Sequence, residues 1–340
     1  MGTLQNFSTR HPIWTLIILV LVVGLAWLVF APWPPGLEQV LGRKRIFLNA
    51  ILSGITLGAL YFLVASGFTL VFGLMRNVNL AHGSLYLLGG YIGFGVVEST
   101  GYWLLAFPVV FVVVGVLGLL LQHQVFRRME GEELRQTLVT IGLSIVLADL
   151  MLWYWGGQSY QVYSPDWLSG PMELPIISSL RSNGDPVYLT YPRVRLAILF
   201  AAIVIGLAMW YALNRSRLGM LIRAGVDDRD ILAASGVHIQ YVFLAVFGFG
   251  AGMAGIAGIV GGTFQSLSPG EDTRFLLASL VVVIVGGMGS IPGAAIGALI
   301  IGLAEQIGLV YAPTYSVVFT FLIMAVVLAF RPQGLLGAQR

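Results

Sequence analysis

The sequence predicts an all-α integral membrane protein in which about ten helices cross the bilayer. Hydrophobic residues make up 58% of the 340 residues and charged residues only 10%, and the mean hydropathy is +0.90. A soluble domain carries about 25% charged residues, so this composition is typical of a membrane protein. Uncharged apolar runs of bilayer length also recur along the chain. Such runs span lipid as helices, because a helix satisfies its own backbone hydrogen bonds.

Composition excludes several kinds of functional site. The chain has no cysteine, which excludes disulfides, thiolate nucleophiles and cysteine-based metal sites. The phosphate-binding pattern G-x-x-x-x-G-K-[ST] is absent, and Lys44 is the only lysine. A net charge of +3 is ordinary for a membrane protein with basic cytoplasmic loops, so it gives no reason to expect nucleic-acid binding. Any ATP hydrolysis must therefore come from another chain.

The first expected span is the uncharged run over 13–31. This run is too long for the apolar part of a signal peptide, and prolines follow it instead of a small-residue cleavage site, so we expect it to be retained. A loop then ends in Arg43, Lys44 and Arg45. The next apolar run, over 46–75, exceeds the thickness of the hydrocarbon core, which predicts a tilt or a break.

A polar segment interrupts the apolar sequence at 76–84. Irregular backbone at membrane depth survives only where protein or a water-filled cavity satisfies it. One interpretation is a broken helix beside a translocation path, with a new helix starting near Ser84 and its N-terminus facing an anionic group. The other is a hairpin turn at the membrane interface. The residues expected to line the path are Asn77, Asn79, His82, Gly83 and Ser84.

The middle of the chain predicts alternating spans and loops. Residues 85–97 form a short apolar segment, and residues 103–121 and 137–155 form spans separated by an arginine-rich connection. By the positive-inside rule this connection is cytoplasmic. Residues 156–191, rich in Pro, Ser, Tyr and Trp, are expected to be an external loop with an aromatic belt at the interface. The run over 196–213 then returns to the cytoplasmic side.

The most polar stretch, residues 214–240, lies between two bilayer-length apolar runs and must therefore lie in water next to the membrane. Asp227 and Asp228 can cap a short helix that Gly236 ends in a left-handed turn. Such an alanine-faced helix suits docking onto another protein, and a plain solvated loop is the alternative. The expected docking residues are Arg223, Asp227, Asp228, Arg229, Asp230, Ile231, Leu232, Ala233, Ala234 and Gly236.

A second interruption follows a short apolar segment over 275–285. Before it, glycines at three- and four-residue spacing in 241–264 predict close helix packing. Two short segments broken by Gly or Pro, in comparable places of two halves, indicate an internal pseudo-repeat and a route through the middle of the membrane. The residues of this second break expected to line the route are Gly286, Gly287, Gly289, Ser290 and Pro292.

The last spans, over 294–308 and 315–330, bring the expected total to about ten and both termini to the cytoplasmic side. Two acids lie within apolar runs, and a proton- or cation-coupled secondary transporter would use Asp149 and Glu305. Alternatively, Glu305 lies at a helix end among head groups, and Asp149 makes an interhelical hydrogen bond. The four histidines are scattered and no H-E-x-x-H motif occurs, so we expect no catalytic residue and no metal site.

Several motifs, in order along the chain, resemble the permease subunits of branched-chain amino acid ABC importers. The motifs are LSGITLGALY at 52–61, GFTLVFG at 67–73, NLAHG at 79–83, TIGLSI at 140–145, RLGM at 217–220, GGMGSIPG at 286–293 and RPQGLLG at 331–337. The resemblance implies a type II-like bundle of importer helices. Residues 1–45 are then an N-terminal extra span and loop, residues 46–337 the transmembrane domain, and residues 214–240 its cytoplasmic coupling loop.

The resemblance also implies partners. In that family two permease chains form a dimer, two P-loop ATPases drive it, and a periplasmic or lipid-anchored binding protein delivers the solute. The chain is then a non-catalytic subunit in a bacterial or archaeal cytoplasmic (inner) membrane, with ATP and Mg²⁺ on the ATPases and no cofactor of its own. The expected substrates are branched-chain or other hydrophobic amino acids. Ser84 stands where such permeases often have glutamate, so importers of urea, short amides or aromatic acids are the alternative.

Overall fold

The computed structural model describes residues 43–75, 77–129, 131–180, 185–227 and 234–337, with single positions at 24, 27, 33, 36, 38 and 232. Nearly all of the predicted first span lies outside the described residues, so that span stays a prediction. Contacts divide the chain into two compact units, which we describe separately. One comprises Met1–Leu52 with Pro171–Tyr191, and the other Ser53–Gly170 with Pro192–Arg340. This division does not test the boundary expected after residue 45.

Four long helices make up the first half of the described chain. They are α4 (Lys44–Met75), α5 (His82–Thr100), α6 (Trp103–Gln124) and α7 (Glu133–Trp155), and a 3-10 turn η1 (Phe126–Met129) follows α6. The 32 residues of α4 are continuous and extend about 48 Å at 1.5 Å per residue. Because this length exceeds a hydrocarbon core of about 30 Å and the helix is unbroken, the structure agrees with the first of the two predicted alternatives for 46–75, a tilt, and not with a break inside the run.

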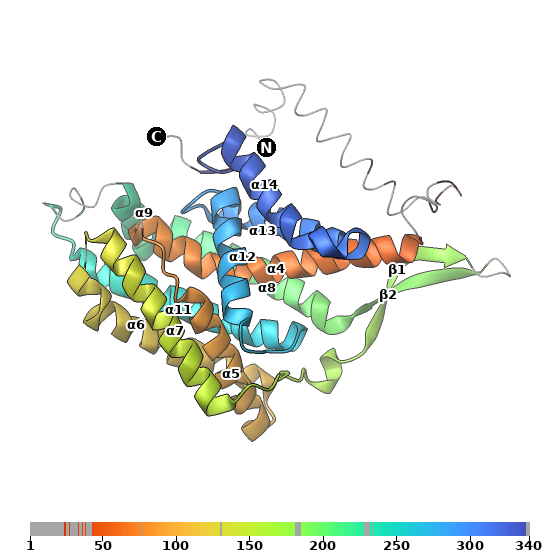
Figure 1. Cartoon of the computed structure of the whole chain (residues 1–340), viewed down its shortest axis with the longest axis horizontal. Coiled ribbons are helices and arrows are strands. Elements are labelled where there is room, and N and C mark those ends of the chain that lie inside the picture. Colours follow the sequence, from red (N-terminus) through yellow and green to blue (C-terminus); the bar gives the residue numbers. More distant parts are fainter. Residues whose placement is uncertain are drawn as a thin grey trace. The chain divides into compact units, whose positions relative to one another are not determined.

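The second half is also mainly helical (Figure 1). It contains η2 (Asp166–Leu168), α8 (Arg193–Arg215), α9 (Arg217–Asp227), α11 (Ile239–Phe264), α12 (Glu271–Gly286), α13 (Ile291–Tyr311), η3 (Pro313–Tyr315) and α14 (Ser316–Phe330). Seven helical segments in the described part of the chain are long and apolar enough to cross a membrane, namely those built on α4, α6, α7, α8, α11, α13 and α14. Helices α5 and α12, next to the two predicted breaks, are not among them.

The centre of the larger unit is α11, which packs along both α5 and α6 (Figure 1). Its glycines make this possible, because side chains at these positions would collide with the neighbouring helices. A Cβ on Gly258 would overlap with the carbonyl oxygen of Tyr86, and one on Gly255 would lie 2.8 Å from a methyl carbon of Val110. The close packing predicted from the glycine spacing is therefore confirmed.

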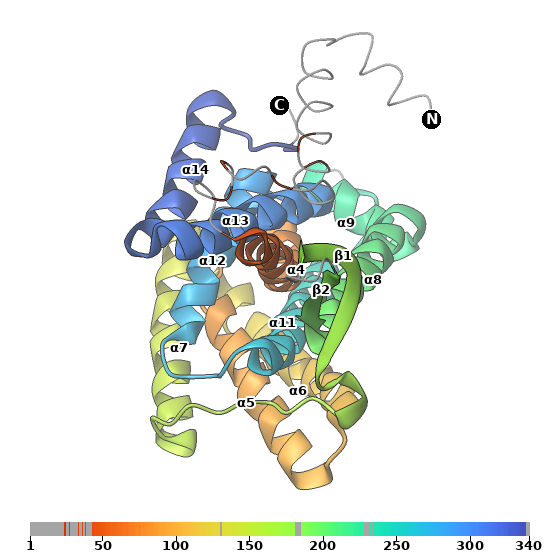
Figure 2. The same ribbon diagram turned by 90° about the vertical axis from the view of Figure 1, so that its right-hand side faces the viewer.

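A second close contact joins α4 and α13. A Cβ on Gly58 would lie 2.8 Å from the carbonyl oxygen of Ala298, and one on Gly54 would lie 2.9 Å from the Cα of Leu303. Figure 2 shows α4 nearly end-on with α13 beside it, and Figure 1 shows α12 running steeply across α4. Helices α4, α12 and α13 therefore meet in one region of this unit.

The smaller unit contains a β-hairpin of β1 (Pro171–Leu180) and β2 (Pro186–Pro192). The hydroxyl of Ser178 donates to the carbonyl of Val187 at 2.9 Å. The sequence predicts only an external loop here, because Pro175 interrupts the first apolar run and proline inside a run weakens the signal for a strand. Before α4 proceeds into the larger unit, the Arg45 guanidinium donates to the Thr190 hydroxyl at 3.3 Å.

Candidate functional site

The first predicted break, between α4 and α5, is buried inside the protein. Asn77 and Asn79 are each only 6% exposed. The Thr137 hydroxyl of α7 donates to Oδ1 of Asn77 at 2.9 Å, and Oδ1 of Asn79 accepts the backbone N–H two residues later at 3.1 Å. A second threonine of α7, Thr140, accepts a backbone N–H of the break at 3.1 Å. Protein groups thus meet part of the hydrogen-bonding need of this segment, while Nδ2 of Asn77 has no partner among the described residues. The segment is buried, and the choice between a broken helix and a cytoplasmic or interfacial turn stays a prediction.

The start of α5 is pressed against the first turn of α12. A Cβ on Gly83 would overlap with the carbonyl oxygen of Asp272. The Ser84 hydroxyl lies 3.4 Å from Oδ2 of Asp272, so a protein carboxylate stands at the beginning of this helix. His82 is 1% exposed, and its Nε2 lies 3.0 Å from the carbonyl oxygen of Val64 on α4. These contacts tie the predicted path residues to both α4 and α12.

The second predicted break, between α12 and α13, depends on glycine conformation. Gly287 and Gly289 have φ angles of 106° and 81°, a region that side chains disfavour. Ser290 then caps α13, since its Oγ accepts the N–H of Gly293 at 3.1 Å. Pro292 follows in the first turn of α13, where the backbone N–H that proline lacks would have no acceptor within the helix. The break is therefore a sharp, fixed turn between two helices.

The C-terminal segment covers the end of α12 at this turn. The N–H groups of Leu335 and Leu336 donate to the carbonyls of Val285 and Gly286, each at 2.9 Å. Gly289 also touches the end of α4, because a Cβ on Gly73 would lie 2.9 Å from its Cα. Both sets of predicted path residues therefore contact α4, but no hydrogen bond among the described residues joins one set to the other.

The short helix predicted after Asp227 falls mostly outside the described residues, but another helix, α9, precedes it in the predicted coupling loop. Helix α9 has 11 residues and begins just after the end of α8. The Ser216 hydroxyl accepts the N–H of Gly219 at 2.9 Å, and Nη1 of Arg223 donates to Oδ1 of Asn214 at 2.8 Å. Ile222 is buried, whereas Met220 is 56% exposed. The amphipathic pattern of 217–227 is the sequence signal that could have predicted this helix.

Only part of the expected docking set falls on described residues. Asp228, Arg229, Asp230, Ile231 and Ala233 lie outside them, and Asp227 is described only as the last residue of α9. Ala234 is exposed, and Gly236 has the expected left-handed φ of 85°. Leu232 is only 7% exposed and lies 3.3 Å from the position of a Cβ on Gly225. Its side chain therefore packs inward against α9 and is not a free docking contact.

The two acids in apolar runs have different surroundings. Asp149 is exposed on α7 and takes part in none of the hydrogen bonds of the described residues, so the expected interhelical bond is absent there. Glu305 has a side chain only 16% exposed and accepts a hydrogen bond from the Tyr61 hydroxyl at 2.6 Å. Glu305 lies in the last two turns of α13, and its partner Arg274 lies in the first turn of α12, so the helix-end position among head groups stays a prediction.

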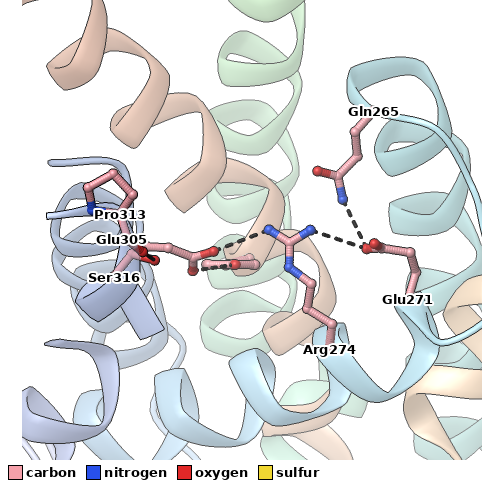
Figure 3. Close-up of polar contacts among 7 residues, drawn as sticks. Gln265, Glu271, Arg274, Glu305, Pro313 and Ser316 are labelled. Carbon is pink, nitrogen blue, oxygen red and sulfur yellow. Dashed lines mark hydrogen bonds and ion pairs between the residues drawn. The ribbon is translucent and has the colours of Figure 1, made fainter. Parts of the chain in front are cut away.

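Glu305 belongs to a polar network drawn in Figure 3. The guanidinium of Arg274 donates from Nη2 to Glu305 at 3.2 Å and from Nη1 to Glu271 at 3.3 Å. The amide of Gln265 donates to the same oxygen of Glu271 at 3.2 Å. Glu271 and Arg274 lie in the first turn of α12, and Gln265 directly follows α11, so this side of the network stands at helix ends. The network could not be predicted from the sequence, because its members come from α4, α12, α13 and the end of α11.

Comparison with known proteins extends over most of the chain. The family of proteins described as "branched-chain amino acid transport system / permease component" matches residues 50–328. The high-affinity branched-chain amino acid transport system permease protein BraD of Pseudomonas aeruginosa is 29% identical over 303 residues, 86% of this chain and 96% of that protein. LivH of Escherichia coli K12, a permease protein of the same kind of system, is 29% identical over 306 residues, with the same shares covered.

A more distant relative comes from an archaeon. The probable branched-chain amino acid transport permease protein LivH of Methanocaldococcus jannaschii is 24% identical over 309 residues, 87% of this chain and 93% of that protein. No solved structure matches the chain. The family match includes both breaks, α9 and most of α14, and spans well over half of the chain. The protein is therefore a multi-pass membrane protein that belongs to the family of permease components of branched-chain amino acid transport systems.

Proposed function

We propose that this chain is the transmembrane permease subunit of an ATP-driven importer of branched-chain or other hydrophobic amino acids. The observation that carries the proposal is the family match over 50–328, together with relatives that align along nearly their whole length. The chain lacks a P-loop, so two separate ATPase subunits bind ATP and Mg²⁺. A second permease subunit and a solute-binding protein complete the importer in the cytoplasmic membrane of a bacterium or archaeon.

We further propose that α5 and α12 serve as crossing segments beside the seven long apolar helices. Each is short or glycine-rich and adjoins a break, which is the pattern of discontinuous helices in transporters with inverted repeats. With the predicted first span, the number of crossings is then ten. The first span is an addition ahead of a transmembrane domain over 46–337, and the two breaks bound the route of the solute.

Coupling is assigned to the segment over 214–240. It is the most charged stretch between two apolar spans, and α9 exposes Met220 and Arg223 on its surface. Movement of the ATPases on ATP binding would push on this short helix. Because α9 packs on α8, and a Cβ on Gly225 would lie 3.0 Å from Leu74 of α4, the push reaches a helix that borders both breaks. The permease then opens to one side of the membrane at a time.

The proposal is tested by reconstitution in proteoliposomes with candidate ATPase subunits, a second permease subunit and a solute-binding protein. We expect leucine to accumulate only when ATP and all subunits are present. Urea, acetamide and phenylacetate serve as competing solutes that represent the other importers of this group. Uptake by the purified chain without an ATPase would contradict the proposal and favour a secondary transporter.

A further inference from the structure

A cavity of about 620 Å³ lies where the end of α6 meets the beginning of α11. The two helices pack along each other, and both are long and apolar enough to cross a membrane (Figure 1). The cavity therefore stands where two spans end, on the side that the positive-inside rule predicts to be cytoplasmic. Its volume falls within the range of ligand pockets, about 300–1,000 Å³. Its described polar lining comprises Gln122, His123, Arg127, His238, Gln240 and Tyr241.

The described lining of this cavity carries basic groups only. Arg127 lies in η1, directly after α6, and forms no ion pair with any other described residue. His123 and His238 bring imidazole groups from the ends of α6 and α11. No acidic side chain is among the described residues of the lining. An anionic ligand is therefore favoured here over a cationic or zwitterionic one.

The beginning of α11 adds the partial positive charge of a helix N-terminus. This helix has 26 residues, and no side chain caps it at His238. The backbone N–H groups of Ile239 and Gln240 have no acceptor within the helix, and both residues line the cavity. Free N–H groups at the start of a helix bind phosphate and carboxylate groups, because they point at the ligand along the helix dipole.

Gln122 has an amide group without a partner at this cavity. The residue is only 2% exposed, and its side chain forms no hydrogen bond with the described residues. Oε1 is enclosed, whereas the equally unpaired Nε2 is not, so the N–H end of the amide is the one that reaches the cavity. Buried amides are almost always hydrogen-bonded. An anion in the cavity would supply the missing acceptor.

The surface beside the cavity indicates what kind of anion binds. Val116, Leu120 and His123 are spaced by four and three residues, so they share one face of α6. Val116 and Leu120 are 47% and 48% exposed, and this face leads about 10 Å along the helix away from the cavity. Tyr241, which is 71% exposed, is an aromatic residue of the kind found among head groups. This arrangement matches a lipid with its head group in the cavity and an acyl chain along α6.

We propose that this cavity binds the phosphate head group of an anionic membrane lipid. The phosphate accepts hydrogen bonds from Arg127, from Nε2 of Gln122 and from the N–H groups at the start of α11. Basic pockets between membrane helices bind such head groups on the cytoplasmic side. A zwitterionic lipid would also bring an ammonium group, for which the described lining offers no carboxylate. The site gives the chain a lipid ligand that is separate from any transported solute.

The test titrates the purified full-length permease in neutral detergent with short-chain phosphatidylglycerol and follows its melting temperature. Phosphatidylglycerol should raise the melting temperature of the wild type, whereas phosphatidylcholine should not. We expect the affinity for phosphatidylglycerol to fall about fivefold or more in Arg127→Gln. The matched control is Arg128→Gln, which changes the neighbouring arginine, an exposed residue that does not line the cavity, and should bind like the wild type.

Gln122→Leu provides a second variant that should fold normally. It keeps a similar side-chain size and removes an amide that has no partner within the described residues. The affinity for phosphatidylglycerol should fall in this variant while the melting temperature without lipid stays the same or rises. If Arg127→Gln and Gln122→Leu both bind the lipid as tightly as Arg128→Gln does, or if the wild type gains no stability from phosphatidylglycerol, the site is overturned.

A further arm separates a lipid from a soluble phosphate. Inorganic phosphate and glycerol 3-phosphate should stabilise the wild type less than phosphatidylglycerol at the same concentration, because they lack the chain that packs on Val116 and Leu120. Equal stabilisation by either of them would overturn the lipid assignment. None of these measurements depends on solute uptake, so failure of this site and failure of the proposed import function give different results.

Discussion

Tyr61 makes one of the shortest hydrogen bonds in the described structure, at 2.6 Å to the carboxylate of Glu305. The two residues lie 244 positions apart, and Arg274 on a third helix shares the same carboxylate. The Glu305 carboxylate thus joins α13 to α4 through Tyr61 and to α12 through Arg274. Tyr61 itself is only 1% exposed.

Tyr61→Phe tests the strength of this contact. Hydrogen bonds to charged groups contribute about 1.5–3 kcal/mol in soluble proteins, but interhelical hydrogen bonds in membranes average nearer ~0.6 kcal/mol. The membrane value should govern here, so we expect the free energy of unfolding to fall by about 0.5–2 kcal/mol. The measurement is unfolding in mixed micelles by a graded detergent series. The control is Tyr102→Phe, whose side chain is 71% exposed and should change stability little.

At the scale of elements, glycine determines how closely the helices approach. Gly258 lies on α11 where it crosses α5, and a Cβ there would overlap with a backbone oxygen, which cannot rotate away. Gly95 lies within α5, but a Cβ added there would have no neighbouring atom within 4 Å in the described structure. The two glycines share a helical conformation and differ only in their surroundings.

Substitution of these two glycines by alanine should have opposite effects. Gly258→Ala should destabilise the protein by about 1–3 kcal/mol or more, because the helices must move apart. Gly95→Ala should stabilise it by about 0.5–1 kcal/mol, since alanine loses less backbone entropy in a helix. Thermal unfolding of both variants in the same detergent gives the comparison. Equal effects would mean that helix propensity, not packing, governs these positions.

Helix α9 supplies a prediction about coupling. Met220 is 56% exposed on this helix, so Met220→Asp leaves the fold intact and changes the docking surface. If α9 contacts the ATPase, the affinity of the permease for the ATPase should fall about tenfold or more in this variant, and ATP-driven uptake should be lost. Leu232→Asp should instead reduce the amount of folded permease, because it places a charge at a buried position. Pull-down of the ATPases and size-exclusion chromatography distinguish the two results, and normal uptake by Met220→Asp would contradict the docking role.

The sequence predicts elements best where the signal is local. Long apolar runs, the glycine spacing of α11 and the left-handed Gly236 all depend on neighbouring residues, and the structure confirms them. The hairpin and the network of Arg274 depend on pairing between distant segments, which no window of sequence contains. Of the candidate site, the two breaks could therefore be located from sequence, whereas the polar network of Tyr61, Arg274 and Glu305 could not.

At the scale of the whole molecule, the orientation in the membrane is set by charge and by the number of crossings. By the positive-inside rule, the arginines before α7 and around α9 predict that those loops lie inside. With ten crossings, Arg43, Lys44 and Arg45 are then expected outside, against the rule. The hydrogen bond from Arg45 to Thr190 offers a reason, because it ties this residue to the hairpin in the predicted external loop. A fixed partner in that loop can outweigh the general preference for the inside.

The absence of cysteine makes this orientation directly testable, because any introduced cysteine is the only one. With ten crossings, cysteines at Met220 and at residue 2 should react with a membrane-impermeant maleimide only after the cells are opened. A cysteine at Tyr163, which is 75% exposed in the 156–191 loop, should react in intact cells. Labelling of Met220 from outside would contradict its contact with a cytoplasmic ATPase. Labelling of residue 2 from outside, with Met220 still protected, would show an odd number of crossings before α9. The basic residues 43–45 would then mark a first segment that does not cross the membrane.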